Sequence, residues 1–157
     1  MKKYDYLWIG IILVIIFLII SPYTNSIFIN ITMNYPYILA FIKFMILATM
    51  GEILAIRIKK NFWEKPIGVF YRAVIWGFFG ILITIAFNIF SNGIIACQFK
   101  GYILGDQSHL AFAFFTATFM NLFFAPVFMA MHKCTDSYID MKFSNKKRKI
   151  TFNLNYS

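Results

Sequence analysis

Acidic residues and cysteines are scarce in this sequence. Only 6 of its 157 residues are Asp or Glu, against 15 Lys and Arg, and it has 2 cysteines. Two cysteines are too few for a disulfide framework, and neither Cys97 nor Cys134 has a cysteine or histidine neighbour at the spacing of a zinc site. The sequence also lacks a phosphate-binding loop and the GxSxG and HExxH motifs. We therefore expect no metal site, no cofactor and no enzymatic activity.

Charged residues as a whole are also few. They make up 13% of the chain, against 61% hydrophobic residues, and the mean hydropathy is +0.71. This composition is far from that of a soluble globular protein and indicates that the chain resides in a lipid bilayer. The net charge of +9 comes from residues that flank apolar runs and form no polar face. Anionic lipid headgroups are therefore the expected partner, and nucleic acid is not.

Four apolar runs have about the ~20 residues that a membrane-spanning helix requires, although the first is short. Helix-breaking residues such as Pro22, Pro36, Pro66 and Gly101 lie between the runs. The sequence predicts an all-α membrane protein with four transmembrane helices in an antiparallel bundle. The predicted helices cover residues 6–20, 37–58, 69–91 and 110–131 of a transmembrane domain that extends over residues 1–140.

The distribution of Lys and Arg predicts the orientation of these helices. Cations lie before the first run, between the second and third runs and after the fourth, whereas residues 21–36 carry no charge and Lys100 is the only cation between residues 91 and 109. Cytoplasmic loops retain Lys and Arg, so both termini are predicted to be cytoplasmic in a multi-pass protein of the bacterial cytoplasmic membrane. Residues 141–157 are predicted to form a basic cytoplasmic tail at the membrane surface. The tail either binds anionic lipid headgroups or only fixes the orientation of the protein, without a specific partner.

Small residues predict which helix faces pack, because close backbone approach drives helix association in lipid. The first run has only Gly10 among bulky aliphatic residues, so we expect it at the lipid-facing rim. The other three runs have stripes of small residues: Ala48, Gly51 and Ala55; Ala73, Gly77, Gly80 and Thr84; and Ala113, Ala117, Asn121 and Ala125.

Each of these stripes carries one polar residue: Glu52, Asn88 or Asn121. One interpretation is an inward-facing polar seam. The alternative is that the groups are interhelical hydrogen-bonding contacts, each contributing about 0.6 kcal/mol. We favour the alternative for the two asparagines, because membranes tolerate amides better than charges.

Glu52 needs a partner, because an unpaired carboxylate inside a membrane is costly. Lys43 is half a turn out of phase with Glu52 and is predicted to point away from it, while Arg57 is placed to reach headgroups by itself. The cations at the same depth on other helices are Arg72 and His132. We therefore predict a cluster of Glu52, Arg72 and His132, with contacts within about 4 Å.

His132, Asp136 and Asp140 follow one another at intervals of four residues and would share one face if the fourth helix continued. Such a face can bind a divalent metal or support acid and base chemistry. A solvated face with an internal ion pair is the favoured interpretation, because there is no second cluster of ligands.

Three stretches, "KFMILATMGEILAIRI", "RAVIWGFFGILITIAFNIFSNGI" and "FFTATFMNLFFAPVFMAMHKCTDSYID", resemble bacterial relatives of the twenty-two-kilodalton peroxisomal membrane protein family, across about residues 43–140. The mitochondrial members of that family behave like inner-membrane channels. The Trp- and Pro-rich carboxy-terminal signature of the family does not occur in this sequence. The resemblance implies passage of small solutes and draws attention to Glu52, Trp76, Asn121, Pro126, His132 and Asp136.

Two functions therefore stay open. The first is a channel-like or small-solute transport component in which Glu52 selects or gates; four helices leave little room for a pore, so a homo-oligomer would be needed. The second is a structural or accessory membrane protein whose polar residues only hold the helices together. An enzyme that uses His132 and Asp136 has the least support.

Overall fold

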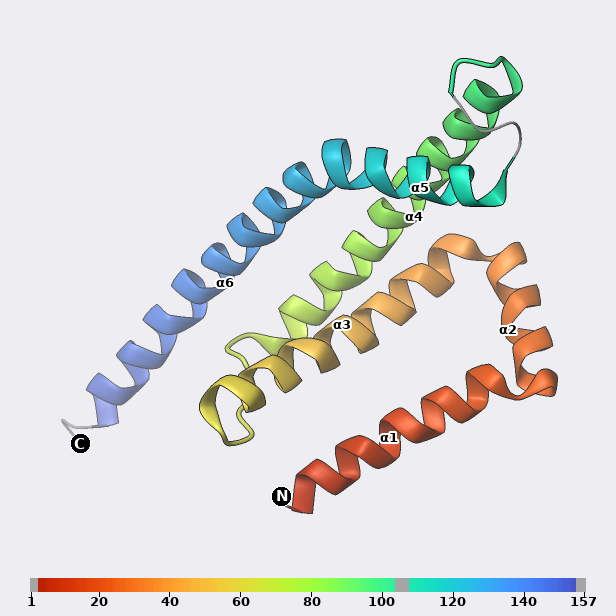
Figure 1. Cartoon of the computed structure of the whole chain (residues 1–157). Helices are drawn as coiled ribbons and strands as arrows, with labels where there is room; N and C mark the ends of the chain where they lie inside the picture. The colour runs from red at the N-terminus through yellow and green to blue at the C-terminus, as the bar shows by residue number, and fades with distance from the viewer. Residues whose placement is uncertain (1–2, 104–107, 155–157) are drawn as a thin grey trace.

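The computed structural model describes residues 3–103 and 108–154, with side chains for residues 4–103 and 108–144. Its regular structure is helical (Figure 1). The elements are α1 (Lys3–Ile20), α2 (Pro22–Asn34), α3 (Pro36–Lys60), α4 (Val69–Phe99), α5 (His109–Phe119), the π-helix η1 (Met120–Phe124) and α6 (Ala125–Leu154).

Three helical segments are long and apolar enough to cross a membrane: Pro36–Lys60, Val69–Phe99 and His109–Ser144. A fourth candidate is the pair Tyr4–Ile20 and Pro22–Asn34, which is bent by 80°. The predicted all-α membrane bundle is therefore confirmed, and the structure offers three candidate spans, or four if the bent pair counts as one span.

The segment after α1 was predicted as a loop and is instead the helix α2. Pro22 and Pro36 do separate the apolar runs, but each lies in the first turn of a helix, α2 and α3 respectively. Proline is well suited to that position because its missing N–H has no intrahelical partner there and its φ angle is already helical. The two prolines therefore set the sharp corners on either side of α2.

α3 and α4 pack closely because α4 has glycine at the crossing. A Cβ atom on Gly77 would lie 2.5 Å from the ring of Phe41, and one on Gly80 would lie 2.7 Å from the backbone oxygen of Ala40. Phe41 also packs edge to face with Phe78, with ring centroids 5.4 Å apart. The small-residue stripe predicted on α4 is thus at an interface.

The stripe predicted on α3 is not at this interface. Gly51 and Ala55 are exposed, and a Cβ atom on Gly51 would have no neighbour within 4 Å. The reason is geometric: the glycines of α4 receive the Phe41 and Phe44 side chains, so the Ala40 turn, and not the Gly51 turn, comes closest to α4.

The small-residue stripe predicted on the last span does not form a packed face either. Ala113, Ala117 and Asn121 are exposed, and α5 instead buries Thr116. The π-helix η1 then disrupts the spacing: the Ala125 N–H bonds to the Met120 oxygen, five residues back. The wider turn lies just before Pro126, where a regular helix would suffer a clash with the carbonyl four residues earlier.

α6 extends well past residue 131, to Leu154, so the segment after residue 140 continues the helix; its role as a basic cytoplasmic tail stays a prediction. Its continuation packs on the start of α4. Ile139 is only 3% exposed, and a Cβ atom on Gly68 would lie 2.7 Å from Ile139 Cγ2. Gly68 also has φ +68°, in the left-handed region that glycine adopts without strain. The side chains of residues 145–157 lie outside the described part of the chain.

α1, α3, α4 and α6 run back and forth along roughly one direction (Figure 1). The start of α1, the α3–α4 turn and the end of α6 lie at one end of the molecule, and α2 and the end of α4 lie at the other (Figure 1). This arrangement gathers the cation-rich segments at one end. The assignment of that end to the cytoplasm stays a prediction.

Candidate functional site

The most buried charged side chain among the described residues is Arg72, which is 6% exposed. It occupies the first turn of α4, where its backbone N–H bonds to the Gly68 oxygen at 3.1 Å. Its guanidinium lies between α3 and α6 and bonds to side chains of both helices. We use the term Arg72 cluster for the five side chains gathered here: Glu52, Arg72, His132, Asp136 and Asp140.

Arg72 uses all three of its nitrogens. Nη1 donates to Glu52 Oε1 at 2.8 Å and to Asp136 Oδ1 at 2.7 Å. Nη2 donates to Asp140 Oδ1 at 2.8 Å, and Nε donates to the Ile67 backbone oxygen at 3.0 Å. A planar guanidinium presents its donors in a fixed fork, so it can hold several carboxylates where a lysine would supply a point charge.

His132 belongs to the edge of this cluster. Its Nε2 lies 3.5 Å from Asp136 Oδ2, and its ring packs on Trp76 with centroids 4.5 Å apart. The structure thus brings Glu52 and Arg72 into direct contact, as the sequence predicted, and places His132 next to them through Asp136. Asp136 and Asp140 share a face of α6, as their spacing predicted.

Sequence reasoning missed the role of Asp140, which was expected to be solvated. Its side chain is 58% exposed but still accepts a hydrogen bond from Arg72. The spacing of four residues between Asp136 and Asp140 could have identified this role. Side chains at that spacing are neighbours on a helix, so a cation that contacts one carboxylate can also reach the other.

Arg57 does not reach headgroups by itself, as was expected, but forms a second ion pair. Its Nε and Nη2 donate to the two oxygens of Asp5 on α1, at 3.0 and 2.9 Å. The Trp63 indole N–H donates to Asp5 Oδ1 at 2.7 Å, and Trp63 stacks on Trp8 at 6.1 Å. Asp5 and Arg57 are 52 residues apart in the sequence, so no local pattern could have predicted this pair.

Lys43 lies near the opposite end of α3. Its Nζ is 5.1 Å from the ring centroid of Phe28 on α2, within the range of a cation–π contact. Lys43 therefore contacts α2, and Glu52 pairs instead with Arg72 of α4.

Asn88 and Asn121 do not join Glu52 in an inward-facing seam. Both are exposed, and Asn88 is about 24 Å further along α4 than Arg72 at a rise of 1.5 Å per residue. The Asn121 amide donates to the Ala117 oxygen of its own helix at 2.9 Å. The described residues therefore form a compact charged cluster at one end of the bundle and no polar path along it.

The Arg72 cluster has the chemistry of an electrostatic joint between helices. The described residues include no group of three or more His, Cys, Asp or Glu side chains that could hold a metal ion. At the centre of the carboxylates, the guanidinium occupies the position that a cation would take. One buried atom, Glu52 Oε2, has no hydrogen-bond partner among the described residues, and neither does Thr49 Oγ1 one turn earlier.

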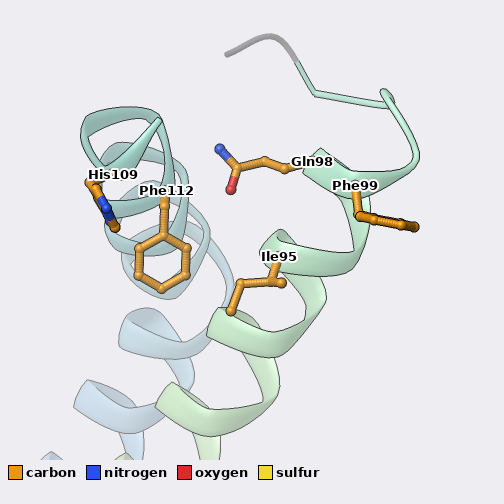
Figure 2. A pocket seen from close by; sticks show the side chains of 5 residues that line it. All are labelled: Ile95, Gln98, Phe99, His109 and Phe112. Atoms are coloured by element: carbon orange, nitrogen blue, oxygen red, sulfur yellow. The ribbon is translucent and has the colours of Figure 1, made fainter. Parts of the chain in front are cut away.

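A separate hollow of about 440 Å³ lies between the end of α4 and the start of α5. Figure 2 shows the Gln98 amide directed from α4 towards His109 and Phe112 on α5, with Phe99 pointing away. Gln98 is 8% exposed. Sequence reasoning did not identify this site, because a single amide in an apolar helix gives no pattern.

Comparison of the chain with protein-family models, with curated proteins and with solved structures finds no match. The family resemblance drawn from the sequence stays a prediction.

Proposed function

We propose that this multi-pass integral membrane protein has a structural or accessory role, with the Arg72 cluster as the joint that holds three of its helices together. The observation that supports this function is that one buried guanidinium bonds to carboxylates from both α3 and α6. Arg72 thus supplies one shared cation to carboxylates on two other helices, which is the contact that a structural role requires.

The magnitude of such interactions favours a structural role. Removing one partner of a buried ion pair typically costs about 3–5 kcal/mol, because the remaining charge is left uncompensated. Folded proteins are stable by only about 5–15 kcal/mol in total. A joint of this kind therefore has a large effect on whether α6 stays against α4.

The aromatic contacts beside the cluster support the same role. A continuous group of packed rings lies between α4 and α6. It consists of Trp76 and Phe79 on α4 and Phe128 and His132 on α6, and the ring centroids of Phe79 and Phe128 are 5.0 Å apart. The helices are thus held by apolar packing and charge at adjacent depths. We propose that this end of the bundle faces the cytoplasm, because it carries the cation-rich segments.

Small-solute transport by an oligomer is a second candidate, favoured by the large surface of the chain. Its solvent-accessible surface is 11952 Å², whereas a compact protein of 18.4 kDa has about 8,200 Å². The amides of Asn88 and Asn121 are on that surface. In a homo-oligomer these amides would line a path between copies, in keeping with the resemblance to channel-like proteins.

Replacing Glu52 separates the two functions. With Glu52→Gln, a structural role predicts a lower thermal unfolding temperature and unchanged solute flux in reconstituted vesicles. A transport role predicts altered flux at equal amounts of folded protein. Glu64→Gln is the matched control, because Glu64 is an exposed carboxylate paired with Lys60 at the same end of α3. Altered flux in the Glu52 variant, with the control unchanged, would contradict the structural proposal.

A further inference from the structure

α1 runs alongside α3 (Figure 1) but is separated from it by a crevice. Two hollows, of about 510 and 220 Å³, meet at Trp8 and make up this crevice. On α1 its lining extends from Tyr4 to Ile16. From Tyr4 to Ile16 the helix rises by about 18 Å, close to the ~15 Å thickness of the hydrocarbon in one leaflet.

The lining changes from polar to apolar along this length. At the charged end of the molecule the crevice is lined by Tyr4, Trp63, Glu64 and Lys65. Deeper in, the lining consists of aliphatic side chains such as Ile15 and Leu47. Trp and Tyr are enriched where a membrane meets water, so this gradient follows that of a bilayer leaflet.

The crevice is fixed at its charged end and left unfilled at mid-depth. At the charged end, Asp5 is bonded to Arg57 and Trp63, which fixes the start of α1. At mid-depth Gly51 has no side chain to contact α1, and a Cβ atom there would meet nothing within 4 Å. Apolar walls that face an unfilled space lose their dispersion contacts, so an occupant is favoured.

The size of the crevice selects the occupant. A helix of 10 Å diameter and 18 Å length fills roughly 1,400 Å³, whereas the two hollows, of about 510 and 220 Å³, together provide about half of that volume. A single acyl chain is much narrower than a helix. A helix from a second copy is thus too wide for this space, whereas one lipid chain can enter it.

The charge at the mouth selects the headgroup. Lys65 is exposed, lines the mouth and forms no ion pair with any residue in the described part of the chain. Glu64 beside it is already paired with Lys60. We propose that the crevice between α1 and α3 binds one anionic phospholipid, with its phosphate at Lys65 and one acyl chain between the helices down to Gly51.

Native mass spectrometry of the full chain in detergent tests this site. The protein is mixed with equal amounts of phosphatidylglycerol and phosphatidylcholine that have identical acyl chains. The expected result is one retained phosphatidylglycerol per chain, with at least fivefold preference over phosphatidylcholine. Equal retention of the two lipids would overturn the proposal.

Two variants with matched controls locate the lipid. Gly51→Leu fills the crevice and is expected to lower lipid retention about tenfold. Gly93→Leu on α4, where an added Cβ atom also meets nothing within 4 Å, is expected to leave retention unchanged. Lys65→Glu, a change at an exposed side chain that does not disturb packing, is expected to abolish the preference for phosphatidylglycerol, whereas Lys59→Glu keeps it. Unchanged lipid retention by folded Gly51→Leu protein would overturn the site. An unchanged preference of Lys65→Glu protein for phosphatidylglycerol would also overturn it. If Gly51→Leu does not fold, the result for Lys65→Glu decides.

Discussion

Arg72 Nη1 lies 2.8 Å from Glu52 Oε1, a contact that joins α4 to α3 across 20 residues of sequence. The same nitrogen is 2.7 Å from Asp136 Oδ1 on α6. One atom therefore couples three spans, and the Arg72 side chain is the position where a single substitution should separate them.

Replacing Arg72 tests this coupling. Arg72→Met leaves the carboxylates of Glu52, Asp136 and Asp140 without their cation, and we expect the free energy of unfolding to fall by about 3–5 kcal/mol. Arg72→Lys keeps the charge but lacks the planar fork, so we expect an intermediate loss of about 1–3 kcal/mol. Thermal unfolding in detergent measures both variants. Equal stability of Arg72→Lys and the unmodified protein would contradict the assigned geometry.

The close approach of α3 and α4 is tested at two glycines of the same helix. Gly80→Ala places a Cβ atom 2.7 Å from the backbone oxygen of Ala40, and we expect a destabilisation of about 1–3 kcal/mol from overpacking. Gly93→Ala meets no neighbour within 4 Å and gains the same helix propensity, so we expect no loss. Thermal unfolding of the two variants isolates packing, and similar values for both would rule out the tight crossing.

The ion pair that attaches α1 is tested by a double-mutant cycle on Asp5 and Arg57. Both side chains are little exposed, at 14% and 18%, and the contact is bidentate, so we expect a larger coupling in unfolding free energy than for a pair at the surface. The exposed pair of Lys60 and Glu64 is the control, with about 0.3–0.5 kcal/mol expected. If the Asp5–Arg57 coupling were no larger than that of the control, the pair would not fix α1.

The orientation in the membrane is tested by cysteine labelling. In a background with Cys97 and Cys134 replaced by serine, Ser108→Cys and Ser144→Cys place reporters at opposite ends of the last span. With the cation-rich end in the cytoplasm, a membrane-impermeant maleimide should label position 108 in intact cells and position 144 only after permeabilisation. The reverse pattern would invert the topology.

Part of the candidate site could be predicted because it follows from simple rules. A carboxylate such as Glu52 inside an apolar run needs a cation at the same depth, and Arg72 was identified on that basis. The spacing of His132, Asp136 and Asp140 fixed their common face. The pairing of Arg57 with Asp5 could not be predicted, because local spacing says nothing about which helix ends become neighbours.

The fate of the small-residue stripes shows the same limit. Gly77 and Gly80 lie at a helix crossing, but Gly51 and Ala117 were equally good candidates and face open space or the surface. Periodicity identifies faces that are able to pack. It does not say which of them meets a partner, because that depends on the bulk of the opposing side chains.

The sequence by itself determined that this protein is helical, that it belongs in a membrane and that its cations gather at one end, since hydropathy, length and charge distribution act along the chain. Tertiary structure decided the corner at α2, the extension of α6 over Gly68, the exposure of Asn88 and Asn121, and the crevice beside α1. These features arise from the fit of side chains between helices far apart in sequence, where sterics and charge pairing select one arrangement among several that the same pattern allows.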